Sequence, residues 1–362
     1  MSKLILYVFS FMGAVVLGAL LTSLARALAY RLKFYDRPAG RKNHAKPTPL
    51  TGGWGVFASF LLFAGAGGLL GPFFVRFIPE SLEPLPHYLE NLRGVRKELF
   101  AILLGASWIF VIGLIDDVRP LGPKFKLFAQ VLAVVPLIAA GISIRVFLPW
   151  PWLGWIVTII WSVVLMNSFN FMDNMDGLTA TVGAVIAAVL AIAAGLGGQF
   201  WMPALFLAFA GILVGFLLFN FNPASIFLGD SGALTIGYLL AVFSILTTYY
   251  ESDLPSGLPV LIPLAVMGVP LFDTASVLWI RWRNGTPLMV GDHNHFSHRL
   301  RALGFSVRQT VVTIGLLTGA IGLLSLALRY LDRIEALLHL SGIVMLFAVI
   351  GALEFFGRRR KE

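Results

Sequence analysis

Eleven long apolar stretches constrain the fold of this chain more than any other feature of its sequence. A bilayer core takes about 20 apolar residues of helix to cross, and each stretch has about that length. They lie at residues 4–30, 52–75, 98–115, 126–146, 152–169, 178–198, 203–220, 231–250, 258–280, 310–331 and 336–356. Each is apolar on all sides, and the open edges of a sheet cannot survive in lipid. We therefore expect an all-α integral membrane protein, a polytopic bundle of about eleven transmembrane helices.

The composition agrees with lipid as the solvent of this chain. Of its 362 residues, 58% are hydrophobic and only 12% are charged, about half the charged share of a soluble globular chain. The absence of cysteine excludes disulfide frameworks and cysteine-ligated zinc or iron–sulfur sites. We find no internal repeat and no soluble region, so residues 1–362 are expected to form one transmembrane domain. The first stretch is expected to remain as a span, because it is too long for a signal peptide.

Basic residues set the expected orientation of the bundle. If the first span ends in the cytoplasm, 18 of the 27 Lys and Arg residues lie in inner segments and 8 in outer ones. The inner ones gather at residues 31–46, 119–126, 281–308 and 358–361. The excess of Lys and Arg in cytoplasmic loops places the N-terminus outside and the C-terminus in the cytoplasm. The net charge of +9 then faces anionic lipids and metabolites, and no nucleic-acid partner is needed to explain it.

Five aspartates fall on the cytoplasmic face in this topology, although Lys and Arg alone defined it. They are Asp116, Asp117, Asp173, Asp176 and Asp230, in three separate loops flanked by apolar spans. Oxygen ligands suit Mg²⁺ or Mn²⁺, and Mg²⁺ usually takes one or two carboxylates and completes its shell with water and substrate phosphates. A single aspartate would more often cap a helix. Five on one side favour a shared divalent-cation site.

Amide and basic side chains accompany the aspartates. Asn167, Asn170 and Asn174 have the spacing of one helical face, if the helix continues that far. Lys124 and Lys126 follow the first Asp pair, where a lysine either forms a weak surface ion pair or holds a phosphate. These side chains are compatible with binding of a phosphorylated, sugar-containing substrate.

Three histidines, His293, His295 and His298, occupy the last long inner loop. Their spacing is not that of a zinc protease, so imidazoles that contact phosphate or sugar are favoured over zinc or an incidental cluster. Asp273 lies inside the ninth apolar stretch. An intramembrane Asp is either a functional residue or the buried partner of a nearby Arg.

Five motifs in this order resemble the polyprenyl-phosphate N-acetylhexosamine-1-phosphate transferase family. They are Asp36 to Gly53, Asp116-Asp117, Asn167 to Leu178, Asn220 to Gly232, and His295 to Leu300. The first motif, Asp-x-Pro-x-x-Arg-Lys-x-His, is more similar to the N-acetylglucosamine branch than to the muramoyl-pentapeptide branch. Ser297 departs from the pattern, because the family commonly has His-x-His-His-x-Leu there.

The resemblance implies that a UDP-sugar and undecaprenyl phosphate meet at the cytoplasmic face of a bacterial inner membrane. Sugar 1-phosphate transfer, with N-acetylglucosamine as the expected sugar, would release UMP and begin a cell-envelope polysaccharide such as lipopolysaccharide. The implied catalytic residues are Asp116, Asp117 and Asp230, with Asp230 and Asp173 on Mg²⁺ (or Mn²⁺). The implied substrate-binding residues are Lys46, Lys126, Asn170, Asp173, Asp176, Asn220, Phe227, His295 and His298. The implied site loops lie near 31–53, 116–126, 167–178, 220–232 and 281–309.

Three alternatives remain open at this point. The same chemistry with another UDP-N-acetylhexosamine or a UDP-muramoyl-pentapeptide donor would need the same motifs. A secondary transporter would place its charges near the bilayer midplane within related repeats, whereas these acids lie at span ends. A non-catalytic scaffold would not need Asp116, Asp117 and Asp230. The sequence leaves the oligomeric state open, and a homodimer is compatible with it.

Overall fold

The protein is described by a computed structural model that covers residues 2–36, 47–68, 94–145, 149–287 and 294–359. Within these residues the chain is almost entirely helical, and its strands are a two-residue antiparallel pair. Strand β1 is Tyr35–Asp36 and strand β2 is Thr48–Pro49, with Tyr35 opposite Pro49. The predicted all-α class is confirmed.

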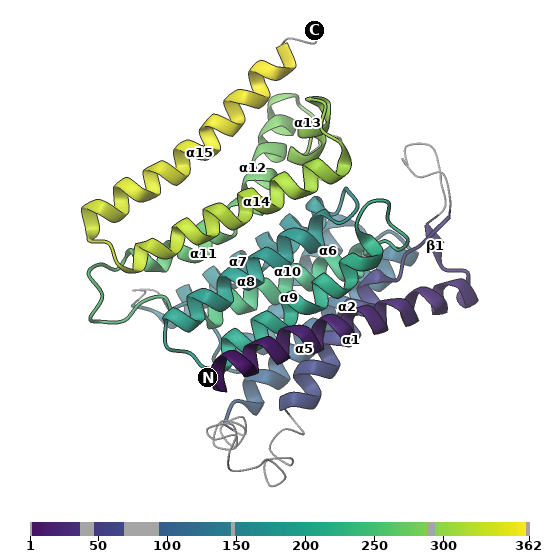
Figure 1. The fold of residues 1–362 in the computed structure, drawn as a ribbon, viewed down its shortest axis with the longest axis horizontal. Helices are drawn as coiled ribbons and strands as arrows, with labels where there is room; N and C mark the ends of the chain where they lie inside the picture. The colour runs from purple at the N-terminus through teal and green to yellow at the C-terminus, as the bar shows by residue number, and fades with distance from the viewer. Residues whose placement is uncertain (1, 37–46, 69–93, 146–148, 288–293, 360–362) are drawn as a thin grey trace.

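The helices follow one another along the chain in the order shown in Figure 1. The first half contains α1 (Ser2–Leu32), α2 (Gly52–Phe60) continued by the π-helix η1 (Leu61–Ala66), α5 (Arg96–Val118), α6 (Pro123–Ala139), α7 (Pro151–Met172) and α8 (Leu178–Leu196). The second half contains α9 (Trp201–Asn220), α10 (Gly229–Leu246), η4 (Leu258–Leu261), α11 (Ile262–Val266), α12 (Gly268–Arg283), α13 (Phe296–Ala302), α14 (Val307–Ser325), η5 (Leu326–Arg329) and α15 (Arg333–Arg359).

Eight of the described helices are long and apolar enough to cross a membrane, which makes the chain a polytopic membrane protein. A ninth span is present if Leu258–Val266 and Gly268–Arg283, bent by 67° at their junction, count as one. The other two predicted stretches fall on the shorter helices α2–η1 and α6, the latter only 17 residues long. The count of eleven therefore stays a prediction, as does the orientation. The start of α1 and the end of α15 lie at opposite ends of the bundle (Figure 1).

Helix α10 forms the centre of the bundle, because 83% of its apolar window is buried by neighbouring helices. Small residues let other backbones approach its first turn, as is usual where membrane helices pack closely. A Cβ on Gly113 of α5 would lie 2.5 Å from the Ser231 Cα, and one on Gly53 of α2 would lie 2.4 Å from the Gly232 nitrogen. Helices α2 and α5 are thus in backbone contact with the start of α10.

Backbone hydrogen bonds fasten the segment before α10 to the start of α2. The Gly52 nitrogen donates to the Phe227 carbonyl at 2.9 Å, and the Gly53 nitrogen donates to the Leu228 carbonyl at 2.8 Å. The Phe227 nitrogen in turn donates to the Pro49 carbonyl at 2.8 Å. The chain before α10 therefore has a fixed path at the end of the bundle where the polar loops meet.

Candidate active site

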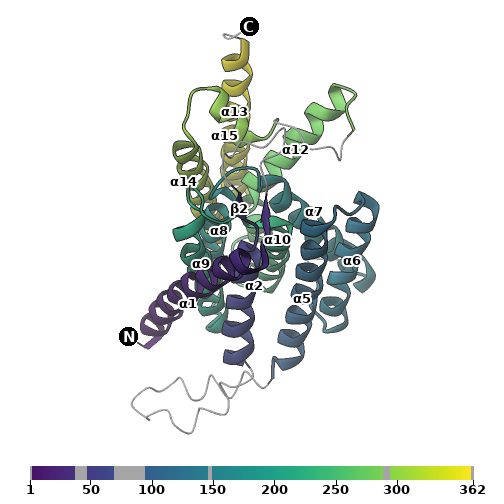
Figure 2. The same cartoon turned by 90° about the vertical axis from the view of Figure 1, so that its right-hand side faces the viewer.

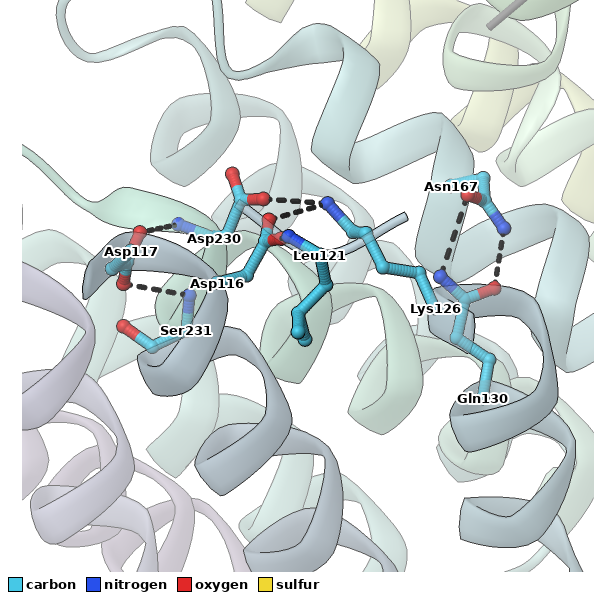
Figure 3. Close-up of polar contacts among 8 residues, drawn as sticks. All are labelled: Asp116, Asp117, Leu121, Lys126, Gln130, Asn167, Asp230 and Ser231. Carbon is cyan, nitrogen blue, oxygen red and sulfur yellow. Dashed lines mark hydrogen bonds and ion pairs between the residues drawn. The ribbon is translucent and has the colours of Figure 1, made fainter. Parts of the chain in front are cut away.

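The adjacent aspartates at the end of α5 have different partners. Asp117 accepts a hydrogen bond from the Asp230 nitrogen at 2.7 Å and another from the Ser231 nitrogen at 3.2 Å (Figure 3). The first N–H groups of a helix lack intrahelical partners and carry partial positive charge, so Asp117 caps α10 from a second helix. Gly229 permits this approach, because its φ is +76° and a Cβ there would lie 2.8 Å from the carboxylate. Asp117 thereby fixes the backbone of Asp230, and with it the position from which the Asp230 side chain extends.

Lys126 lies between two carboxylates at the start of α6. Its Nζ is 2.6 Å from Asp116 Oδ2 and 2.7 Å from Asp230 Oδ2 (Figure 3). The other oxygen of Asp116 accepts from the Leu121 nitrogen at 2.6 Å, which closes the turn between α5 and α6. Figure 2 shows these two helices side by side. Loops that are far apart in the sequence therefore meet at one point, and the carboxylates there attract a cation.

A pair of amides supports this cluster one turn further along α6. Asn167 of α7 donates to Gln130 Oε1 at 2.6 Å, and Gln130 donates back at 3.4 Å. Helix α7 ends at Met172, so the predicted face shared by three asparagines does not reach Asn174. Asn170 lies half-buried on the last turn of α7.

Asp173 follows directly after α7 and accepts a hydrogen bond from the Thr179 hydroxyl at 3.0 Å. Burial, together with the negative charges of Asp230, Asp117 and Asp176, raises the pKa of Asp173 to about 7, against the lowering effect of Thr179. These negative charges act on the pKa of Asp173 because the carboxylates from the three loops lie close enough to repel one another. A bound cation would favour the ionised form of Asp173.

Asp176 and Asn220 hold the neighbouring loops together. Asp176 accepts from the Asn222 amide at 2.9 Å and from the Ala224 nitrogen at 3.1 Å. Asn220, only 6% exposed, accepts from the Gly177 nitrogen at 3.0 Å and donates to the Ile226 carbonyl at 2.8 Å. These bonds join the α7–α8 loop to the α9–α10 loop, so both residues shape the site through its loops.

The histidine motif reaches the same end of the bundle through α13. Ser297 donates to Asn174 Oδ1 at 2.6 Å, which attaches α13 to the loop that carries Asp173. The rings of His295 and His298 have centroids 6.4 Å apart. His295 is bound to Asp273, so the described partner of this intramembrane aspartate is a histidine and not the nearby arginine that the sequence offered.

Comparison with known proteins agrees with this geometry. Residues 99–248 match the model of glycosyl transferase family 4. The decaprenyl-phosphate N-acetylglucosaminephosphotransferase of Mycobacterium tuberculosis is 32% identical, over 85% of this chain and 79% of the relative. The chain belongs to glycosyl transferase family 4. It is also similar to a probable undecaprenyl-phosphate N-acetylglucosaminyl 1-phosphate transferase of Bacillus subtilis, at 29% identity over 87% of this chain and 83% of the relative.

A third relative extends the match to nearly the whole chain. The undecaprenyl-phosphate alpha-N-acetylglucosaminyl 1-phosphate transferase of Yersinia pestis is 25% identical, over 97% of this chain and 90% of the relative. The resemblance predicted from the five motifs is thus confirmed. The segment that matches the family 4 model, residues 99–248, contains all five aspartates of the predicted site.

The structure does not describe every predicted site residue of this family 4 transferase, and two supporting residues were not predicted. Lys46 and His293 lie outside the described residues. Phe227 is half-buried in the segment before α10, and its predicted contact with a uracil ring stays a prediction. Thr179 and Ser297 were missed as supporting residues, because a short hydroxyl side chain gives no signal of its partner in the sequence.

The donor set fits a magnesium ion that is shared with substrate phosphates. Among the described residues, no three His, Asp or Glu side chains are grouped so as to hold a metal by themselves. Mg²⁺ commonly takes only one or two carboxylates and fills its shell with phosphate oxygens and water. Asp230 and Asp173 carry carboxylate oxygens of that kind, which would be the ligands of such an ion, and Lys126 already places one positive charge against Asp230.

Proposed function

We propose that this family 4 transferase moves N-acetylglucosamine 1-phosphate from UDP-N-acetylglucosamine to undecaprenyl phosphate. The observation that carries the proposal is the convergence of Asp116, Asp117, Lys126 and Asp230 at one end of a membrane bundle. The printed names of the relatives support the acceptor and the sugar, since they describe phosphotransferases of N-acetylglucosamine that use undecaprenyl or decaprenyl phosphate. Membership of the family also argues against the transporter alternative.

The reaction exchanges one phosphorus–oxygen bond for another. An oxygen of the lipid phosphate forms a bond to the β-phosphorus of the UDP-sugar, and the bond from that phosphorus to the bridging oxygen breaks. UMP leaves with the bonding electrons, and the product is a polyprenyl diphosphate sugar. A phosphate monoester is already largely ionised at pH 7, so a general base is not required. Alignment and charge neutralisation therefore supply most of the catalysis.

Each proposed role follows from the contacts of the residue. Lys126, whose side chain is 19% exposed, holds a phosphate oxygen with the ammonium group that lies between Asp116 and Asp230. Asp230 and Asp173 would hold Mg²⁺, and the ion would supply positive charge to offset the charge of the diphosphate and of the departing UMP. Asp117 keeps the start of α10, and with it Asp230, in place.

The remaining predicted residues are assigned to the donor. His295 and His298 contact the diphosphate or the sugar, on a helix that Ser297 ties to the α7–α8 loop. To the nucleotide we assign Asn170, Asp176, Asn220 and Phe227, together with Lys46, which lies outside the described residues. We place the site on the cytoplasmic face of a bacterial inner membrane, with the N-terminus outside, because nucleotide sugars are cytoplasmic and the basic loops lie at the site end.

The test is UMP release by purified protein in detergent with undecaprenyl phosphate, Mg²⁺ and a panel of donors. The panel contains UDP-N-acetylglucosamine, UDP-N-acetylgalactosamine and UDP-muramoyl-pentapeptide, and we expect turnover with the first. Asp230→Asn should abolish turnover while the protein stays folded. Asp253→Asn is the matched control, because Asp253 is exposed in the loop after α10, at the opposite end of that helix. Wild-type turnover in the Asp230 variant would refute the assignment, and no UMP with any donor would refute the function.

A further inference from the structure

We propose that Asp273 is a positioning residue for the transfer: it fixes the tautomer of His295 and anchors α13, so that the His295 Nε2 atom contacts the donor substrate. This inference rests on the proposed function, because it names the part of the site that orients the donor. It concerns a residue on α12, away from the aspartates that bind Lys126 or cap α10.

The contacts of Asp273 are few and specific. The residue is 2% exposed and its carboxylate is fully used by the start of α13. Oδ2 lies 2.9 Å from His295 Nδ1, and Oδ1 accepts from the Phe296 nitrogen at 2.5 Å. A buried carboxylate without such partners would be costly. The hydrogen bonds to His295 and to the Phe296 nitrogen therefore explain why an aspartate lies inside this apolar helix.

The carboxylate dictates where the proton of the imidazole ring lies. An ionised carboxylate only accepts hydrogen bonds, so beside an ionised Asp273 the Nδ1 atom of His295 carries the hydrogen. Nδ1 keeps that hydrogen whether the ring is neutral or charged. Nε2 is then the one ring atom left for a substrate, as an acceptor in the neutral ring and as a donor to phosphate in the charged ring.

Other bonds make α13 a rigid link between α12 and the aspartate loop. The Arg299 guanidinium donates to Ser276 Oγ of α12 at 2.9 Å and also to the Asn294 carbonyl. On the other side of α13, Ser297 is bonded to Asn174. Figure 2 shows the end of α12 projecting beyond α7. A shift of Asp273 would therefore displace His295 relative to Asp173.

The decisive substitution is Asp273→Asn, because it preserves size and separates the two roles. The amide oxygen can still accept from the Phe296 nitrogen, so the anchor of α13 persists. The amide NH₂ must then face His295 Nδ1, which converts that nitrogen to an acceptor and moves the ring hydrogen to Nε2. We expect kcat/KM for the UDP-sugar to fall by at least about 10-fold, since a misplaced catalytic tautomer costs several orders of magnitude in other enzymes.

The tautomer itself is read by ¹⁵N NMR of protein labelled at histidine, with the His295 signals identified by their loss in His295→Gln. The wild type should show a protonated Nδ1 on His295, and Asp273→Asn should show a protonated Nε2. A wild-type spectrum with Nε2 protonated and Nδ1 bare would overturn the proposal without any variant. This reading does not depend on activity, so it also separates failure of the proposal from failure of the proposed function.

A double-mutant cycle distinguishes action of Asp273 through His295 from a purely structural role of Asp273. If Asp273 acts through His295, adding Asp273→Asn to His295→Gln should lower kcat/KM no further than His295→Gln alone. Multiplying losses would assign Asp273 a general structural role and overturn the proposal. Thr274→Val is the matched control, because Thr274 is a buried neighbour that bonds only Ser168 of α7 among the contacts described, and it should keep kcat/KM within about 2-fold.

Discussion

Replacing Lys126 by methionine should destabilise the protein without metal and make its stability depend on divalent cations. The Lys126 ammonium is 2.6 Å from Asp116 and 2.7 Å from Asp230, so its removal leaves two nearby carboxylates without a cation. Methionine keeps an unbranched side chain that is one atom shorter than lysine, and it removes the charge and the hydrogen bonds. The substitution therefore isolates the electrostatic contribution of the ion pairs.

The magnitude follows from the exposure of the three side chains. Removing one partner of a fully buried ion pair costs about 3–5 kcal/mol, whereas an exposed pair contributes about 0.2–1 kcal/mol. Here the side chains of Lys126, Asp116 and Asp230 are 19%, 9% and 34% exposed. Solvent reaches Asp230 most, so we expect a loss of about 2 kcal/mol. At roughly 2 °C per kcal/mol for a long chain, the melting temperature should fall by about 4 °C.

Magnesium should reverse part of this loss. In the wild type, Lys126 already neutralises the carboxylate that Mg²⁺ would bind, so ion and ammonium compete for Asp230. In the variant the ion has no competitor, and a ligand at 100 times its dissociation constant stabilises by about 2.7 kcal/mol. The rise in melting temperature on adding Mg²⁺ should therefore be larger for Lys126→Met than for the wild type.

The assay is thermal unfolding in detergent followed by the fluorescence of the nine tryptophans, in EDTA and in saturating MgCl₂. Lys124→Met is the control, because Lys124 is exposed on the same helical turn and should leave the melting temperature unchanged in both buffers. Equal melting of Lys126→Met and wild type in EDTA would refute the ion-pair reasoning. A fall of the same size in both buffers would refute the competition with metal.

Two further predictions concern the capping aspartate and the orientation. Asp117→Asn should lower the free energy of unfolding by about 1 kcal/mol and reduce UMP release, because an amide cannot accept from both the Asp230 and Ser231 nitrogens as a carboxylate does; unchanged melting and turnover would contradict the capping role. Since the chain has no cysteine, Lys124→Cys and Asp253→Cys can each be labelled alone with an impermeant maleimide in intact cells. Only Asp253→Cys should react, and the reverse result would invert the proposed topology.

The gathering of the acids could be predicted from the sequence because span ends alternate between two faces. Asp116, Asp173 and Asp230 each lie at a span end that the basic residues assign to one side, and the structure brings all three loops together. Charge and hydropathy suffice for that result. They act over whole segments, so errors of a few residues in a boundary do not change it.

The pairing inside the cluster could not be predicted, because it depends on how each helix is rotated about its axis. A helix that is apolar all round has no preferred face in its sequence, and its rotation is set by close contacts such as Gly113 against Ser231. The same limit explains Asp273, whose partner proved to be His295. The count of eleven spans stayed unconfirmed because two predicted stretches fall on the short helices α2–η1 and α6, and the break at Met267 bends a third by 67°.

The two aspartates at the end of α5 illustrate how one dipeptide organises the whole site. Successive residues of a helix point roughly 100° apart, so Asp116 and Asp117 face different helices. Asp117 faces α10 and caps it, whereas Asp116 faces α6 and holds both its turn and Lys126. Asp230 is therefore held at two points. Its backbone nitrogen donates to Asp117, and its carboxylate binds Lys126. Together these contacts fix Asp230 against α5 and α6 at once.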